Sequence, residues 1–142
     1  MIYNSIPKHF IPLFEVVGCV CEVKGEILLL RRNEGKSEGG KWGVPGGKVD
    51  PGETLVEAMA REMKEETGHD IPGVDFRYMK KLHVEHPRHQ FIYHLFFATM
   101  PVKPDVRLDS NEHEDFLWVT PENALKLNYV SDFDECLRIV YT

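Results

Sequence analysis

The chain has 142 residues, of which 42% are hydrophobic, so it is long enough to bury a core but short for two ordinary domains. We therefore expect one domain that spans residues 1–142. The formal net charge of -6 disfavours a broad surface for a nucleic acid polymer, although a small phosphorylated ligand can still bind through a metal ion or a local cation.

Cysteine usage and hydropathy indicate the compartment. Three cysteines, Cys19, Cys21 and Cys136, form an odd set in a chain that begins without the pattern of a signal peptide, so we expect a cytoplasmic protein. No apolar run approaches the roughly 18 residues that a spanning helix needs, and we expect no role in a membrane. Cys19 and Cys21 face the same side of an expected strand, which favours two core residues over a zinc site.

The first predicted elements are the two strands of a β-hairpin. Two short runs, 16–23 and 26–32, are rich in β-branched or aliphatic residues and flank Lys24-Gly25. A lysine-glycine pair between such runs is typical of a tight turn, so the runs predict two antiparallel strands. The polar, glycine-bearing segment 33–41 that follows predicts a loop.

The middle of the chain predicts one helix, followed by further strands and a helical C-terminal part. A turn leads into the helix, which we expect over residues 54–67 with Gly68 as its C-terminal cap. β-branched and aromatic residues then mark three strands, at 74–86, 90–100 and 115–120. Two more helical segments begin at Pro121 and Asp132. This order predicts an α/β fold in which helices cover a mixed β-sheet.

The helix at 54–67 combines an apolar stripe with a cluster of carboxylates. At about 100° per residue, one side of it carries the apolar residues Leu55, Val56, Met59, Ala60 and Met63. Glu62, Glu65 and Glu66 converge beside this stripe, and Glu66 falls within it. Neighbouring carboxylates repel one another, and burying one without a counter-charge is costly. A hard divalent cation resolves both problems, because Mg²⁺ binds through a few carboxylates and keeps positions for water and phosphate oxygens.

The glycine-rich segment before the helix suits the same site. Gly43, Gly46, Gly47 and Gly52 permit positive φ angles and close backbone approach. A carbonyl or amide of this segment can therefore reach a metal ion or a phosphate beside the helix. The residue order is not that of a P-loop, and an acidic helix would repel phosphate in the absence of cations.

Residues 47–69 resemble the Nudix box, whose pattern is GX5EX7REUXEEXGU, with U a bulky aliphatic residue. The matching positions are Gly47, Glu53, Arg61, Glu62, Met63, Glu65, Glu66 and Gly68. The departure is His69 at the last U position, where we expect Ile71 to supply the apolar anchor instead. The chain is similar to the Nudix (MutT-like) hydrolases, and the order of the flanking elements resembles that family's α/β/α sandwich.

The resemblance implies a hydrolase that cleaves the diphosphate linkage of a nucleoside diphosphate derivative, such as a nucleoside triphosphate, a nucleotide sugar or an ADP-ribose-like compound. It implies Mg²⁺ or Mn²⁺ bound by Glu62, Glu65, Glu66 and the Gly47 carbonyl. It also implies that Arg61 and Glu53 orient these carboxylates. The alternative is a Nudix-fold domain that senses a nucleotide without turnover, which usually arises with a damaged box, and the box here is intact.

Two regions can supply the general base: the box and the segment "NEHEDFLWVT" at 111–120. Glu112 or Glu114 is expected as a base or a further metal ligand, with His113 and a glutamate of the box as alternatives. The segment resembles the EQHDDYRW stretch of the family's GDP-mannose hydrolases, in which the histidine that matches His113 is the base. Those enzymes depart from the usual box, whereas this chain keeps all its glutamates, so the substrate does not transfer.

Two segments are candidates for substrate contacts. Arg31 and Arg32 end the second expected strand near the box. Either of them can bind the substrate phosphate there or lie on the surface in solvent. Four histidines surround the turn at Pro87, namely His83, His86, His89 and His94. We expect a solvated hairpin tip there, with Arg88 or His86 as the alternative substrate contact. The expected partner is a small nucleotide derivative, and the sequence leaves both a monomer and a homodimer open.

Overall fold

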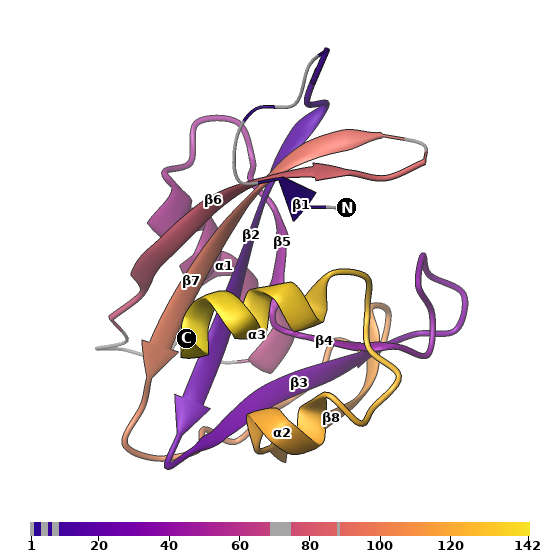
Figure 1. Ribbon diagram of the computed structural model, residues 1–142. Helices are drawn as coiled ribbons and strands as arrows, with labels where there is room; N and C mark the ends of the chain where they lie inside the picture. Colours follow the sequence, from indigo (N-terminus) through magenta and orange to yellow (C-terminus); the bar gives the residue numbers. More distant parts are fainter. Residues whose placement is uncertain (1, 4–5, 7–8, 69–74, 88) are drawn as a thin grey trace.

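The structure, a computed structural model, describes residues 2–3, 6, 9–68, 75–87 and 89–142 (Figure 1). Within these residues the strands are β1 (Ile2–Tyr3), β2 (Phe14–Val23), β3 (Glu26–Arg32), β4 (Trp42–Gly43), β5 (Gly46–Lys48), β6 (Arg77–Glu85), β7 (Gln90–Thr99) and β8 (His113–Val119). The helices are α1 (Leu55–Thr67), α2 (Pro121–Ala124) and α3 (Phe133–Tyr141). None of these helices has the length and apolarity that a membrane crossing requires. His69 and Ile71 lie outside the described residues.

The strands form one mixed sheet with helices on both faces. Its order is β1-β6-β7-β2-β3-β4, with β5 added to β2 and β8 added to β3. β2 and β7 run parallel, whereas the pairs β2–β3, β6–β7 and β3–β8 are antiparallel. In Figure 1, α1 lies behind the sheet and α3 crosses in front of it. The α/β fold predicted from the sequence, a mixed sheet between helices, is confirmed.

The two strands of the predicted hairpin separate as they leave their turn. The Lys24-Gly25 turn joins β2 and β3, which pair beside it, with Glu22 opposite Ile27. Farther along, β5 takes the place of β3 beside β2, and β4 takes the place of β2 beside β3, while β7 and β8 pair along the other edges of β2 and β3. Figure 1 shows β2 and β3 meeting at the turn and diverging from it. The sheet therefore has two arms, and the space between them positions the site described below.

Each face of the sheet carries its own hydrophobic cluster. The cluster on the α1 side contains Met59 and Met63 together with Cys19 and Cys21 of β2. The cluster on the other side contains Phe133 of α3. Both β2 cysteines are fully buried free thiols with their sulfur atoms 3.5 Å apart, so their prediction as core residues is confirmed. Alternating side chains thus let one strand supply both cores.

α1 has the boundaries that the sequence predicts. The Thr54 hydroxyl accepts a hydrogen bond from the Glu57 amide (3.1 Å), and the Glu57 carboxylate accepts one from the Thr54 amide (2.8 Å). This reciprocal pair satisfies two amides that would otherwise lack partners. At the other end Gly68 adopts a φ of 82°, a left-handed conformation that glycine takes without strain. Both ends of the helix are therefore fixed by local chemistry.

The buried side of α1 is rotated relative to the predicted stripe. Two residues that were expected in the stripe are exposed, namely Val56 and Ala60. Ala58 and Thr67 are buried in their place. The centre of the buried side therefore lies closer to Glu62 and Glu66, because α1 packs against β2 and β5 with its carboxylates directed between the arms of the sheet.

The β6–β7 hairpin is less solvated than predicted. His83 and His94 are buried, which corrects the expectation of a solvated tip for these two residues. His94 hydrogen-bonds with the Tyr78 hydroxyl (2.8 Å) and with the Glu15 carboxylate (2.7 Å). The reason is the pairing of β6 with β1 and of β7 with β2, which places both histidines inside the sheet instead of at its end.

Candidate functional site

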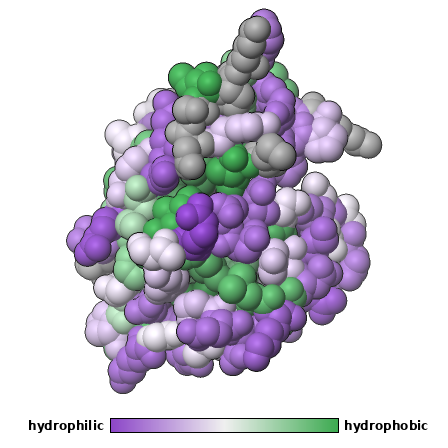
Figure 2. Space-filling view, in the orientation of Figure 1, coloured by the Kyte–Doolittle hydropathy of each residue, from purple (hydrophilic) through white to green (hydrophobic). Residues whose placement is uncertain are grey.

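A cavity of about 910 Å³ lies between the diverging arms of the sheet. Residues of β2, β5 and β7 line one side of it, and residues of β3 and of the loop 33–41 line the other. α1 and the first part of α3 also contribute to the lining. The space-filling view shows the surface indented between the region of the β6–β7 hairpin and the region of the loop 33–41 (Figure 2). Segments that are distant in sequence therefore meet around one space.

α1 presents three carboxylates to this cavity. The Glu62 side chain is 12% exposed, Glu66 is 6% exposed, and the Glu65 side chain is 54% exposed. All three line the cavity, as their convergence on the helix predicts. Because Glu62 and Glu66 are one helical turn apart, their side chains project side by side from the same part of the helix.

Arg61 connects two of these carboxylates, Glu62 and Glu65, to the turn that precedes the helix. Its guanidinium donates to both carboxylate oxygens of Glu53, from Nε at 2.7 Å and from Nη2 at 3.0 Å. Nη1 donates to Glu62 at 3.0 Å and to Glu65 at 3.2 Å, and Nη2 also donates to the Lys48 carbonyl oxygen at 2.9 Å. The bonds from Arg61 hold the pKa of Glu53 below its usual range. Such a two-pronged pair fixes both partners in orientation.

The buried carboxylates carry charge that the protein neutralises incompletely. Burial raises the pKa of Glu66 well above its usual range, and the neighbouring charge of Glu62 raises it further. Burial also raises the pKa of Glu62, against the opposing effect of Arg61. Glu66 accepts a hydrogen bond from the Gly46 amide at 3.0 Å, which offsets part of the cost. A cation between the two carboxylates would stabilise their ionised forms.

Gly47 brings the backbone of β5 against Glu62. A Cβ atom at Gly47 would lie 2.4 Å from the carboxylate carbon of Glu62, so any larger residue would displace that carboxylate. In the described residues no three acidic, histidine or cysteine side chains already converge on one metal position, and Arg61 and the Gly46 amide bond the carboxylate oxygens here. The donors are nevertheless carboxylate and backbone oxygens, which suit Mg²⁺ or Mn²⁺.

The segment before β8 and the first residue of β8 bring three more polar side chains to the cavity, namely Asp109, Glu112 and His113. His113 is 7% exposed, and its Nδ1 has no hydrogen-bond partner among the described residues. Burial and then the positive charge of Arg32 lower the pKa of His113, so its ring is neutral at pH 7 and can accept a proton. The exposed Glu112 carboxylate lies 3.5 Å from Lys36 Nζ.

Of the two arginines that end β3, Arg32 lines the cavity and Arg31 does not. The Arg31 Nε donates to the Gly40 carbonyl oxygen (3.3 Å) and lies 3.3 Å from the Glu114 carboxylate, which also lies outside the cavity lining. The Arg32 Nε donates to the Ser37 carbonyl oxygen at 2.7 Å. Successive residues of a strand point to opposite faces, so Arg31 and Glu114 are not brought together with the other predicted site residues.

The end of the cavity near the β6–β7 hairpin is lined by aromatic rings. We call Phe14, His86, His89 and Phe91 the ring shelf. Phe14 and Phe91 stack with ring centroids 5.2 Å apart, and His86 and His89 stack at 5.6 Å. Lys48, which also lines the cavity, has its Nζ 4.3 Å from the centroid of the Phe14 ring. This end is therefore aromatic and weakly basic, in contrast to the acidic end at α1.

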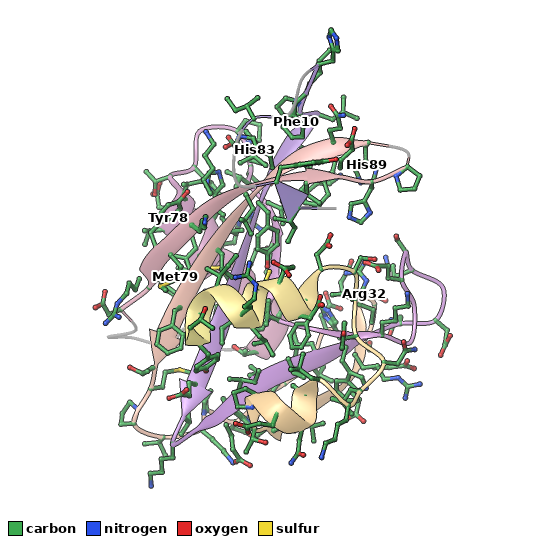
Figure 3. The ribbon with its side chains drawn as sticks, viewed as in Figure 1. Phe10, Arg32, Tyr78, Met79, His83 and His89 are labelled. Atoms are coloured by element: carbon green, nitrogen blue, oxygen red, sulfur yellow. The ribbon has the colours of Figure 1, made fainter. Side chains whose placement is uncertain are left out.

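His89 and Arg32 mark opposite sides of the cavity. Figure 3 shows His89 beneath the tip of the β6–β7 hairpin and Arg32 on the arm below it. The predicted substrate contacts Arg32 and His86 both line the cavity, one on each arm of the sheet. Arg88, another predicted contact, lies outside the described residues.

The cavity residues that were not predicted from the sequence include Asp109, Phe14 and Tyr93. The carbonyl oxygen of Asp109 accepts the amides of Glu112 and His113, so it shapes the turn before β8. Its Asp-Ser-Asn sequence is typical of a turn but does not indicate a cavity. Phe14 and Tyr93 meet the site through the parallel pairing of β2 with β7, a register that neither strand reveals alone.

Comparisons with known proteins agree with this geometry. Residues 12–138 match the NUDIX domain family. The CTP pyrophosphohydrolase of Escherichia coli is 32% identical over 114 residues, which cover 80% of this chain and 81% of that protein. The crystal structure of a MutT protein from Methanosarcina mazei is similar with a TM-score of 0.78 and 34% identity, over 91% of this chain and 94% of that chain. The structure of a C. elegans Ap4A hydrolase has a TM-score of 0.76 and 27% identity, over 90% and 95%. This chain therefore belongs to the NUDIX family and is a hydrolase that acts on phosphorus-containing anhydrides.

Proposed function

We propose that the chain hydrolyses the diphosphate linkage of a nucleoside diphosphate derivative in the cavity between β2 and β3, with Mg²⁺ or Mn²⁺ held by α1. The observation that carries this proposal is the pair Glu62 and Glu66, two largely buried carboxylates that face one cavity. Two such charges are costly side by side without a cation. The cavity, at about 910 Å³, is within the roughly 300–1,000 Å³ that small-ligand sites occupy.

The carboxylates of α1 are the proposed metal ligands, together with a backbone oxygen: Glu62, Glu65, Glu66 and the Gly47 carbonyl. When bound, the divalent cation neutralises charge on the phosphate oxygens and lowers the pKa of a bound water. Arg61 and Glu53 act by position, since their two-pronged pair holds the oxygens of Glu62 and Glu65 in place. Exclusion of larger side chains at Gly47 keeps the backbone in contact with Glu62.

The proposed reaction is a displacement at phosphorus. The oxygen of water forms a bond to phosphorus, the bond from that phosphorus to the bridging oxygen breaks, and the attacking water gives one proton to a base. We assign the base to Glu112, which lines the cavity and whose charge acts on Glu66. His113, neutral and with a free Nδ1 among the described residues, is the alternative. Arg32 is the proposed contact for the phosphates.

The nucleobase is assigned to the ring shelf. Phe14 lies three residues before Val17 on β2, and Val17 pairs with Gly47 beside Glu62. At about 3.3 Å per strand residue, the shelf lies about 10 Å from the carboxylates along the strand. A nucleotide can span that distance with its base stacked on rings and its diphosphate near α1, since aromatic side chains stack on any base.

A hydrolysis screen tests the proposal. Nucleoside triphosphates, nucleotide sugars and dinucleoside polyphosphates are incubated with the protein and Mg²⁺ or Mn²⁺ in ¹⁸O-water, and the labelled product shows which phosphorus was attacked. We expect metal-dependent cleavage of a diphosphate linkage that is lost in Glu66→Gln. Nucleotide binding without turnover of any of these compounds would contradict the proposal and support a nucleotide-sensing domain. Separate Glu112→Gln and His113→Gln variants identify the base, whose removal costs roughly 10²- to 10⁴-fold in kcat.

A further inference from the structure

Tyr93 extends its hydroxyl over a glycine in the neighbouring strand. It lies on β7 and lines the cavity, and its ring reaches across β2. A Cβ atom at Gly18 would lie 1.7 Å from Tyr93 Oη and 2.5 Å from Cζ. Gly18 is within β2 and is not among the glycines with positive φ, so no turn requires a glycine there. A glycine inside a strand weakens it, and here the lost stability makes room for the Tyr93 ring.

The hydroxyl lies beside the backbone that supports Glu66. Gly18 pairs with Gly46, and the Gly46 amide donates to the Glu66 carboxylate at 3.0 Å. Burial, and after it the charges of Cys136, Cys19 and Glu66, raise the pKa of Tyr93 well above its usual range, so the hydroxyl keeps its proton. None of the described residues forms a hydrogen bond with it. The group is thus a neutral donor on a residue that lines the cavity; it lies over Gly18, close to the Gly46–Glu66 hydrogen bond, and has no hydrogen-bond partner among the described residues.

We propose that the Tyr93 hydroxyl donates a hydrogen bond to a non-bridging oxygen of the substrate's diphosphate, and that Gly18 provides the space for this contact. The inference rests on the proposed function, since it assigns the diphosphate to the carboxylate end of the cavity. The chemistry favours an anionic acceptor, because a neutral hydroxyl bonds a charged oxygen more strongly than a neutral one. A purely structural role would need only the ring, which packs against the hydrophobic cluster on the α3 side and which phenylalanine would reproduce.

The experiment compares wild type with Tyr93→Phe, and with Tyr78→Phe as the matched control. Tyr78→Phe removes a hydroxyl that bonds His94 in the same sheet but outside the cavity. The probe is methylenediphosphonate with Mg²⁺, a diphosphate analogue whose P–C–P bridge is not hydrolysed, and its affinity is measured by calorimetry. We expect Tyr93→Phe to bind it roughly ten- to a hundredfold more weakly and to lose a similar factor in kcat/KM, with unchanged Mg²⁺ dependence. Tyr78→Phe should match wild type in both measurements.

Gly18→Ala is a second, independent substitution that should disrupt the same contact. Because the added methyl group displaces the Tyr93 hydroxyl, we expect Gly18→Ala to lower the affinity for methylenediphosphonate to a similar extent. The double variant with Tyr93→Phe should lose little more affinity than either single variant. Equal affinity of wild type and Tyr93→Phe for the probe would overturn the inference while leaving hydrolysis intact. A Tyr93-dependent affinity in a protein that hydrolyses none of the screened compounds would support the contact and refute the proposed function.

Discussion

Two buried histidines, His94 and His113, occupy opposite kinds of environment. They are exposed to similar extents, 4% and 7%. His94 has a partner for each ring nitrogen, the Tyr78 hydroxyl at 2.8 Å and the Glu15 carboxylate at 2.7 Å. His113 lines the cavity, and its Nδ1 has no partner among the described residues. Burial alone therefore does not distinguish a structural histidine from one that is available to a ligand.

The difference extends to the other polar groups. Away from the cavity, the buried side chains of His94 and Thr67 are hydrogen-bonded within the protein, as most are in native structures, whereas His83 Nδ1 has no partner among the described residues. Around the cavity, Glu62 and Glu66 carry incompletely neutralised charge, and the Tyr93 hydroxyl bonds none of the described residues. Unsatisfied polar groups are costly, so their concentration in one cavity indicates that a ligand completes them.

The largest expected effect comes from removing one buried charge on the cavity side. Glu66→Gln keeps the shape of the side chain and an oxygen that can accept the Gly46 amide, but it removes one negative charge from the proposed metal site. We therefore expect kcat at saturating Mg²⁺ to fall by several orders of magnitude. The control is Glu122→Gln, an exposed glutamate of α2 outside the cavity lining. If Glu66→Gln turns over substrate at the wild-type rate and has an unchanged circular dichroism spectrum, the Glu66 carboxylate is not part of the catalytic site.

A smaller effect is expected from the residue that positions the carboxylates. Glu53→Gln breaks the two-pronged pair with Arg61, which then loses its fixed orientation toward Glu62 and Glu65. Activity should fall by roughly 10- to 100-fold, and the Mg²⁺ concentration for half-maximal rate should rise. Steady-state kinetics over a Mg²⁺ titration measure both. If neither value moves, Arg61 holds its geometry without Glu53, and the positioning role is wrong.

The ring shelf should affect affinity more than turnover. Phe14→Leu keeps apolar bulk beside Phe91 but removes a stacking surface, so KM for the best nucleotide substrate should rise about tenfold, with kcat little changed. Competition by methylenediphosphonate, which has no base, should be unaffected. An equal loss for the nucleotide and for methylenediphosphonate would mean that Phe14 supports the fold of the cavity and does not contact a base.

The unsatisfied carboxylates should make stability depend on pH. The pKa values of Glu62 and Glu66 are raised in the folded state, so the folded protein binds protons at these two carboxylates more tightly than the unfolded chain does. Their stabilising contribution is full below the usual glutamate pKa of about 4.3 and is lost as the pH rises through the raised values. Urea unfolding in EDTA should show wild type losing stability over this rise relative to Glu66→Gln. The absence of any pH-dependent difference would contradict the buried charge pair.

The satisfied histidine should give the smallest functional effect. Tyr78→Phe removes one partner of His94, and the free energy of unfolding should fall by about 1 kcal/mol while kcat/KM stays unchanged. Thermal or urea unfolding and steady-state kinetics check the two parts. A change in kcat/KM would show that the two histidine environments are coupled, and the comparison between them would fail.

The sequence predicts those parts of the site that depend on local spacing. Glu62, Glu65 and Glu66 converge because a helix repeats every 3.6 residues, and the helix ends follow from Thr54 and Gly68. The resemblance of the box to a known pattern then indicates the chemistry. These inferences need no knowledge of which strands pair.

The features of the site that the sequence did not predict depend on pairing between distant segments of the chain. The separation of β2 from β3 creates the cavity, yet their sequences predict only a hairpin. Whether Arg31 or Arg32 faces the cavity depends on the side of β3 that turns inward. Tyr93 reaches the site because β7 pairs in parallel with β2, and Gly18 leaves it room. Periodicity within one segment carries no information about these registers.

The most direct test of the central claim is Mn²⁺ binding measured by electron paramagnetic resonance, which reports free Mn²⁺ in a titration of the protein. We expect wild type to bind Mn²⁺ and the Glu62→Gln/Glu66→Gln double variant to lose this binding while it keeps its fold, because the cation neutralises the two buried carboxylates. Equal Mn²⁺ affinity in wild type and the double variant would show that the metal binds elsewhere and would contradict the account.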